Sequence, residues 1–132
     1  MNILLLEPDM SIAQSVTNAF SDRGHLVRWA TSSQMGIDLA DSQVPDVVVL
    51  ELAIPWHNGI EFIYEFRSYA EWFNIPIIVF STLFTDKHHL LKKISIDEYL
   101  YKPVTTLQQL ITTCNELVAH HAQHGATHLK ES

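Results

Sequence analysis

Charged and hydroxyl side chains close four short apolar runs of this sequence, and these side chains are the ones best suited to chemistry. The runs and their closing residues are 3–6 with Glu7, 47–50 with Glu51, 77–80 with Ser81, and 98–101 with Lys102. The chemistry that they offer is electrostatic, because two nearby carboxylates repel each other unless a cation lies between them. Lys102, on its flexible stem, is the available counter-ion. Such chemistry requires a fold that brings the ends of the four runs together.

The apolar runs are predicted to be strands of one parallel sheet. Continuous apolar runs of this length suit strands that are buried on both faces. Residues 47–50, Val-Val-Val-Leu, form the purest β-branched run and are the predicted central strand. A fifth run at residues 25–30 alternates in part, which is typical of an edge strand. In open parallel sheets the site lies outside the carboxyl ends of the strands, which is where the four closing residues stand.

Segments with helical spacing separate the strands. The predicted helices cover residues 10–23, a short segment after 31–33, 60–72, 86–94, and a last segment that starts near 105. Asp9 or Ser11 can cap the first helix, and Gly125 is expected to end the last one. Five strands that alternate with five helices predict an α/β fold, with helices on both faces of the sheet and right-handed crossovers.

The composition is that of one globular domain. The chain has 132 residues, of which 47% are hydrophobic and 17% are charged, and this excludes a disordered chain. Its 15 acidic and 8 basic residues give a net charge of −7, which disfavours nucleic-acid binding because phosphate contacts need lysine and arginine in excess. No apolar stretch approaches the roughly 20 residues that span a bilayer, so no membrane contact is expected.

Several features predict a cytoplasmic protein. The single cysteine, Cys114, cannot form an intrachain disulfide, and we expect it to be a small buried apolar residue of the last helix. The first ten residues lack the basic region of a signal peptide. A reduced, cytoplasmic environment is therefore expected.

Histidines and aromatic residues outside the strand ends allow two interpretations each. His120, His121, His124 and His128 could share a helix face and bind a metal, but Gly125 interrupts that face, so a solvated tail is favoured. The apolar stripe of the third helix is expected to be Phe62, Phe66, Tyr69 and Phe73. Three further aromatic residues are not needed for the core, and they either lie flat on the surface or dock a partner: Trp29, Tyr64 and Trp72.

Several of the motifs together resemble the receiver domain of bacterial response regulators. They are Leu5-Leu6-Glu7-Pro8-Asp9, Pro45-Asp46-Val47-Val48-Val49-Leu50-Glu51, Pro55-Trp56-His57-Asn58-Gly59, Ser81-Thr82 and Tyr99-Leu100-Tyr101-Lys102-Pro103. The resemblance covers about residues 2–122, so we expect a receiver domain at 1–122 and a C-terminal tail at 123–132. It implies a flavodoxin-like three-layer sandwich, with a five-stranded parallel sheet of order 2-1-3-4-5 and five helices.

The resemblance also assigns roles to individual residues. In such receivers an aspartate after the third strand is phosphorylated, acidic residues after the first strand help to bind Mg²⁺, and a hydroxyl and a lysine contact the phosphoryl group. The corresponding residues here are Glu51 for the phosphoacceptor, Glu7 and Pro8 for the acidic pair, and Ser81 and Lys102 for the phosphoryl contacts. Tyr99 matches an aromatic residue that changes rotamer on activation, although a half-buried strand residue is the plainer interpretation. The backbone carbonyl of Ala53 matches a metal ligand.

Two of these positions depart from the family pattern. Glu51 is one methylene longer than aspartate, and phosphoryl transfer tolerates little displacement of its acceptor. Pro8 removes a carboxylate, so the acidic pocket is left with Glu7, Asp9 and Glu51, and Mg²⁺ binding is expected to be weak or absent. We expect no other cofactor.

The implied strand order places Glu7 and Glu51 on neighbouring strands, whose backbones lie about 4.8 Å apart. A contact between Glu51 and Lys102 would resemble the charge arrangement of a phosphorylated receiver. The hypothesis is therefore a pseudo-receiver that is not an enzyme and is not switched by ordinary aspartyl phosphorylation.

The expected partners are proteins. A histidine kinase or a downstream effector is implied, and so is a homodimer through the face of helix 4, strand 5 and helix 5, where Tyr99, Tyr101 and Lys92-Lys93 lie. Two alternatives stay open. One is a working phospho-receiver that accepts a phosphoryl group at Glu51 or Asp9. The other is a small flavodoxin-like enzyme or cofactor binder, against which stands the lack of a Gly-rich phosphate loop in a chain with 4 glycines.

Overall fold

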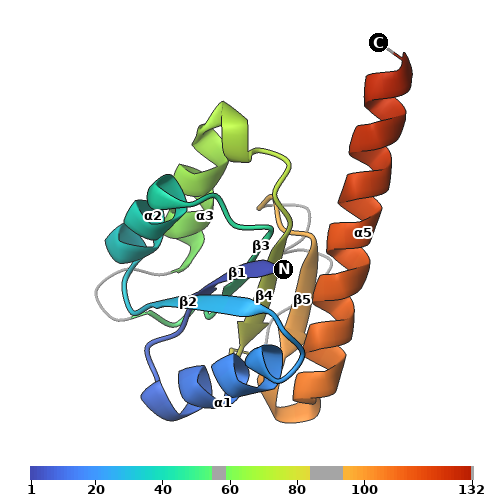
Figure 1. The fold of residues 1–132 in the computed structure, drawn as a ribbon. Helices are drawn as coiled ribbons and strands as arrows, with labels where there is room; N and C mark the ends of the chain where they lie inside the picture. Colours follow the sequence, from blue (N-terminus) through green and yellow to red (C-terminus); the bar gives the residue numbers. More distant parts are fainter. Residues whose placement is uncertain (55–58, 84–93, 132) are drawn as a thin grey trace.

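A five-stranded parallel sheet forms the centre of the protein in the computed structural model, which describes residues 1–54, 59–83 and 94–131 (Figure 1). The strands are β1 (Asn2–Leu6), β2 (Leu26–Ala30), β3 (Val47–Leu50), β4 (Ile77–Ser81) and β5 (Glu98–Tyr101). Neighbouring strands pair in parallel in the order β2-β1-β3-β4-β5. The predicted flavodoxin-like order is confirmed, with β3 at the centre and β2 at an edge.

Helices cover both faces of the sheet and make the predicted three layers. The described residues contain four α-helices, which are α1 (Met10–Ser21), α2 (Ser33–Ser42), α3 (Gly59–Ser68) and α5 (Leu107–Glu131). They also contain two short 3₁₀ helices, η1 (Ala70–Trp72) and η2 (Lys102–Val104). Figure 1 shows α2 and α3 on one side of the sheet and α1 and α5 on the other. The helix predicted at residues 86–94, Lys92-Lys93 and the loop at 55–58 lie outside the described residues.

Local hydrogen bonds explain where the helices begin. The side chain of Asp9 accepts a hydrogen bond from Ile12 N at 3.1 Å, so Asp9, and not Ser11, is the cap of α1. Ser32 caps α2 in the same way, through Met35 N at 3.2 Å. Thr106 and Gln109 exchange side-chain to backbone hydrogen bonds ahead of α5, which is a capping box.

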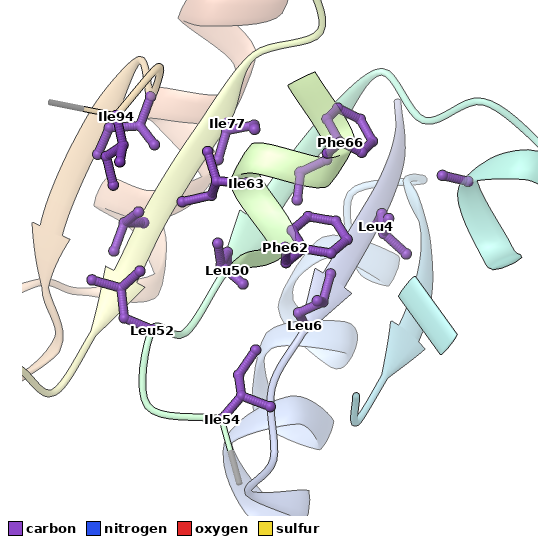
Figure 2. Close-up of a cluster of buried hydrophobic side chains, with 14 of the residues drawn as sticks. Leu4, Leu6, Leu50, Leu52, Ile54, Phe62, Ile63, Phe66, Ile77 and Ile94 are labelled. Carbon is purple, nitrogen blue, oxygen red and sulfur yellow. The ribbon is translucent and has the colours of Figure 1, made fainter. Parts of the chain in front are cut away.

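The alternation of side chains along each strand divides the core into two parts. Leu4 and Leu6 of β1 face α2 and α3, where they join a cluster with Leu50, Phe62 and Phe66 (Figure 2). Ile3 and Leu5 face the opposite way and pack with α1 and α5. The core residues on that second side include Val16, Phe20, Val49, Leu110 and Cys114. The prediction that Cys114 is buried is confirmed, and burial raises the pKa of its thiol to about 12.

The region after α3 corrects two predictions about aromatic residues. The predicted helix over 60–72 ends at Ser68, and η1 follows it. A 3₁₀ turn has 3.0 residues per turn instead of 3.6, so it changes which residues face the core. Trp72 is therefore buried and stacked on Phe66, with ring centroids 5.0 Å apart, whereas Phe73 is 58% exposed. Tyr64 is exposed, as predicted, and Trp29 is half-buried.

The prediction that Gly125 ends the last helix is wrong. α5 continues through this residue to Glu131. A glycine inside a helix costs about 1 kcal/mol relative to alanine, but its N–H still donates to the helix, so it does not force an end. Within the described residues, no helix has both the length and the apolar character that a membrane crossing requires.

Gly59 holds the start of α3 against the end of β3. Its N–H donates to Leu52 O at 2.8 Å, and a Cβ at this position would lie 2.9 Å from Leu52 Cα and 3.0 Å from Glu51 O. Because backbone atoms cannot yield as side chains do, we predict that Gly59→Ala lowers the free energy of unfolding by about 1–3 kcal/mol in urea titrations. Gly36→Ala in α2 is the matched control, because a Cβ there would meet side-chain atoms of Phe62 and Leu6 at 3.0–3.2 Å and no backbone atom, so we expect a smaller loss. Equal stability of the two variants would contradict this account.

Candidate functional site

The parallel sheet brings the four predicted site residues together at one edge. Glu7, Glu51 and Lys102 directly follow β1, β3 and β5, and Ser81 is the last residue of β4. The register pairs Leu6 with Leu50 and Ser81 with Tyr101, so the strands end at about the same level. Glu7, Glu51 and Ser81 are also the polar or charged residues that are buried in the described part of the chain. Their burial singles out this edge of the sheet as the candidate site.

Lys102 lies between the two carboxylates. Its Nζ is 2.9 Å from Glu51 Oε1 and also forms an ion pair with Glu7 Oε1. The side chains of all three residues are less than a tenth exposed, and Nζ lies 5.4 Å from the centroid of the Phe80 ring. The predicted contact between Glu51 and Lys102 is therefore present, and the same ammonium group also neutralises Glu7. Two negative charges thus share one positive charge in a pocket that is largely shielded from solvent.

The carboxylate of Glu51 accepts hydrogen bonds on both of its oxygens. Besides Lys102, Oε1 accepts from Thr82 N at 3.0 Å and from Thr82 Oγ1 at 3.1 Å. Oε2 accepts from Ser81 Oγ and from Ala53 N at 3.2 Å. Burial by itself would raise the pKa of Glu51, but the hydrogen bonds from Ser81, Lys102 and Thr82 and the charge of Lys102 outweigh it and hold that pKa below its usual range. The site is built to keep Glu51 ionised.

The other predicted acidic residue, Asp9, lies at the border of the pocket. Its carboxylate is used as the cap of α1 and its side chain is exposed, because the helix needs an acceptor at this position. The backbone N–H of Asp9 does reach the site, where it donates to Glu7 Oε2 at 3.1 Å. Asp9 thus contributes an amide to the pocket, and its carboxylate belongs to the helix.

Two contacts of the site were not predicted from the sequence. Thr82 gives Glu51 two hydrogen bonds, although only its position next to Ser81 marks it in the sequence. Trp29, which was treated as a surface residue, donates from Nε1 to Glu7 O at 2.7 Å. The pairing of β1 with β2, which sets Leu6 opposite Ala30, brings this indole to the site. Trp56, in the predicted loop after β3, lies outside the described residues.

Tyr99 is connected to the pocket through the backbone that follows β4. Its side chain is buried, and its hydroxyl donates to Leu83 O. Leu83 N in turn donates to Ser81 Oγ at 3.1 Å, and Ser81 donates to Glu51. Burial, with a smaller contribution from the charge of Glu51, raises the pKa of Tyr99. A chain of hydrogen bonds thus joins Glu51 to the residue that was predicted to be a switch aromatic.

The donor set does not fit a magnesium ion. Mg²⁺ needs oxygen ligands in near-octahedral geometry, usually including carboxylates that are free to coordinate. Here Lys102 occupies the space between Glu7 and Glu51, both oxygens of Glu51 already accept hydrogen bonds, and Pro8 offers no side-chain oxygen. The described residues contain no group of three or more histidine, cysteine, aspartate or glutamate side chains that could hold a metal. The role of the Ala53 carbonyl as a ligand remains a prediction.

Comparison with known proteins gives one family. Residues 3–115 match the model of the response regulator receiver domain. The KDP operon transcriptional regulatory protein KdpE of Escherichia coli is 31% identical over 103 residues, which are 77% of this chain and 44% of KdpE. Protein PilH of Pseudomonas aeruginosa is 28% identical over 118 residues, which are 89% of this chain and 97% of PilH. The chain spans about half the length of the first curated relatives that it matches.

Solved structures give the same result for the fold. The receiver domain of the Francisella response regulator 1452 superposes with a TM-score of 0.80 at 27% identity, and the match covers 90% of this chain and 97% of that one. The chemotaxis protein CheY4 of Vibrio cholerae gives a TM-score of 0.81 at 23% identity, over 88% of this chain and 97% of that one. At that identity the second likeness concerns the fold alone.

Removing the ammonium group of Lys102 should lower the stability of the folded protein. We predict that Lys102→Met lowers the free energy of unfolding by about 3–5 kcal/mol, because it leaves two buried carboxylates without a counter-charge. The double variant Lys102→Met/Glu51→Gln should recover part of the loss, since one of the charges is then gone. Urea unfolding of both variants and of Glu51→Gln completes the cycle. A loss below about 1 kcal/mol for Lys102→Met would contradict a buried bridging role.

The lowered pKa of Glu51 predicts a stability difference that depends on pH. A carboxylate whose pKa is lowered in the folded state stabilises the protein above its unfolded pKa of about 4.3, and this contribution is lost as the pH falls through the folded pKa. Wild type should therefore exceed Glu51→Gln in unfolding free energy by a constant amount above about pH 5, on the order of 2 kcal/mol, and the gap should close in more acidic solution. A gap that widened toward low pH would contradict the assignment.

Proposed function

The chain belongs to the family of response regulator receiver domains, and on this basis we propose that it is a pseudo-receiver of two-component signalling in which Glu51 stands in place of a phosphoryl group. The observation that carries the proposal is the set of contacts to the Glu51 carboxylate. Ser81 and Lys102, the residues that the family resemblance assigns to the phosphoryl group, both bind this carboxylate instead. The carboxylate of Glu51, directly after β3, is thus already bound by the residues that would otherwise contact a phosphoryl group.

The same contacts oppose phosphorylation of Glu51. An incoming phosphoryl group must approach a carboxylate oxygen in line with its leaving group, and catalysis of this transfer rests on positioning and on metal ions. Both oxygens of Glu51 are covered by donors, and the side chain is 4% exposed. Pro8 stands where the family pattern has an acid that would hold the metal, and the ammonium group of Lys102 lies between Glu7 and Glu51, where a metal ion would otherwise bind. These features favour a site that does not turn over a phosphodonor.

The output of such a protein is a conformation that is held without a chemical step. The hydrogen bonds from Glu51 through Ser81 and Leu83 to Tyr99 hold the side chain of this β5 residue in the buried cluster on the α3 side of the sheet. The partner is then a histidine kinase or an effector that recognises this state, or a second copy that binds through a face to which β5 and α5 belong. Because receiver domains act in signalling, we propose a cytoplasmic, non-enzymatic role through protein contacts.

A titration with a phosphoryl analogue tests the proposal. Wild type should show no saturable, Mg²⁺-dependent change in tryptophan fluorescence when beryllium fluoride is added, because the pocket offers neither a metal site nor a free carboxylate oxygen. Trp29, whose indole donates to the backbone of Glu7, is the described reporter. The double variant Pro8→Asp/Glu51→Asp restores the family pattern and should gain such a response, and intact-mass measurement after incubation with acetyl phosphate should follow the same pattern.

The controls separate this proposal from the alternative of a working phospho-receiver. A saturable, Mg²⁺-dependent response of wild type that disappears in Glu51→Ala would refute the pseudo-receiver and favour phosphorylation at Glu51. A response that survives in Glu51→Ala but disappears in Asp9→Ala would point to Asp9. An absorbance spectrum of the purified protein with flavin bands would favour the remaining alternative, a cofactor binder.

A further inference from the structure

A second recess lies at the opposite edge of the sheet from Glu51. It has a volume of about 980 Å³ and is bounded by the residues that precede three strands, which are Pro45 and Asp46 before β3, Ile75 and Pro76 before β4, and Asp97 before β5. Its other wall is α5, through Leu117, Val118 and His121. Figure 1 shows that α5 runs past the sheet at this edge. We call this recess the amino-edge groove. None of its lining residues belongs to the Glu51 site.

The amino-edge groove combines an apolar floor with acidic walls. Ile75, Leu117 and Val118 are only partly buried, and Val44 and Phe73, which adjoin lining residues in the sequence, are 52% and 58% exposed. The carboxylates that line it belong to Asp46, Glu71 and Asp97, and none of its lining residues is lysine or arginine. Asp97 is paired with Arg67, whereas Asp46 and Glu71 form no ion pair with a described residue, and exposed apolar side chains next to such acidic ones are typical of a surface that binds a partner.

Two of the three carboxylates are held in fixed positions. Asp46 accepts a hydrogen bond from Asn2 N at 2.6 Å. Asp97 accepts from Ile77 N at 2.8 Å, pairs with Arg67 at 3.2 Å and lies 3.3 Å from His121 Nε2, which links it to α5. Glu71, on η1, is exposed. Asp46 and Glu71 are thus the exposed acidic side chains of the groove, and Asp97 is the partly buried one.

The charges of the protein favour a positively charged partner for the groove over a second copy of this chain. Side chains are described for residues 1–54, 59–83 and 94–122, and each lysine or arginine side chain among them is bound to another group of the protein: Arg23 to Gln108, Arg28 to the end of α2, Arg67 to Asp97 and Lys102 to Glu7 and Glu51. A second copy of this chain, which also carries a net charge of −7, is a poor occupant because like charges would face each other. A positively charged partner is complementary to the groove.

We propose that the amino-edge groove docks a basic segment of a partner protein, an extended stretch in which arginine or lysine alternates with apolar residues. The apolar side chains of this segment would pack on Ile75, Leu117 and Val118, and its cations would face Asp46 and Glu71, the exposed carboxylates of the groove. Val44 and Phe73 adjoin Pro45 and Asn74 of the groove in the sequence and are exposed, and a peptide segment, unlike a small cationic molecule, is long enough to contact them as well. The inference concerns a different edge of the sheet from the pseudo-receiver pocket and does not rest on it.

Binding of a synthetic peptide tests the proposal. The probe is a fluorescein-labelled peptide in which arginine alternates with leucine and proline, and its matched control carries glutamate in place of each arginine. The arginine peptide should bind wild type in anisotropy titrations, and two-dimensional amide NMR should show shift changes at Glu71, Asn74, Leu117, Val118 and His121. Glu71→Lys should weaken binding by about fivefold or more, and Phe73→Ser by about threefold, since each removes a favourable contact of the peptide.

Matched variants give outcomes that would overturn the proposal. Glu65→Lys makes the same charge change on an exposed residue of α3 outside the groove and should alter binding by less than about twofold. Glu51→Ala should leave peptide binding unchanged, so failure here is distinct from failure of the proposed function. Equal weakening by Glu65→Lys and Glu71→Lys, shift changes outside the groove, or no binding would refute the docking site. Equal affinity for free spermidine would assign the groove to a small cation and refute the protein segment.

Discussion

The ammonium group of Lys102 between the carboxylates of Glu7 and Glu51 is the interaction on which the candidate site depends. Two buried carboxylates on neighbouring strands would otherwise repel each other in a poorly solvated space. Lys102 directly follows β5, which is separated from β3 by β4, so its two ion pairs connect the ends of three strands, β1, β3 and β5. Ser81 of the intervening strand completes the connection through its hydrogen bond to Glu51.

The fold supports this arrangement by making the strand ends rigid. The strands are buried on both faces, with Leu4, Leu6 and Phe62 on one side and Ile3, Leu5 and Phe20 on the other. Close-packed cores of this kind transmit small displacements instead of absorbing them. The close approach of Gly59 to the backbone of Leu52 adds a second restraint, immediately after Glu51. A carboxylate one methylene longer than aspartate can therefore be held by several donors at once.

The two edges of the sheet carry different chemistry. At the carboxyl edge, Lys102 pairs with Glu7 and Glu51, so the positive charge is bound within the pocket. The amino edge presents carboxylates beside exposed apolar side chains. α5 is the element common to both, because it starts close to Lys102 and lines the amino-edge groove with its later turns. The chain belongs to the receiver domain family, and the side chains of its carboxyl edge bind one another.

The sequence predicted the strands, because continuous apolar runs have few alternatives to buried parallel strands. The family resemblance supplied the strand order, and with it the residues that meet at the carboxyl edge. Only the tertiary structure decided which atoms meet. It placed the Asp9 carboxylate on α1, gave Glu51 the donors of Thr82 and Ala53, and turned Trp72 into the core and Phe73 out of it. It also formed the amino-edge groove from segments far apart in the chain. Periodicity reports which face of an element is buried, whereas hydrogen bonds and ion pairs depend on distances between elements, which packing alone sets.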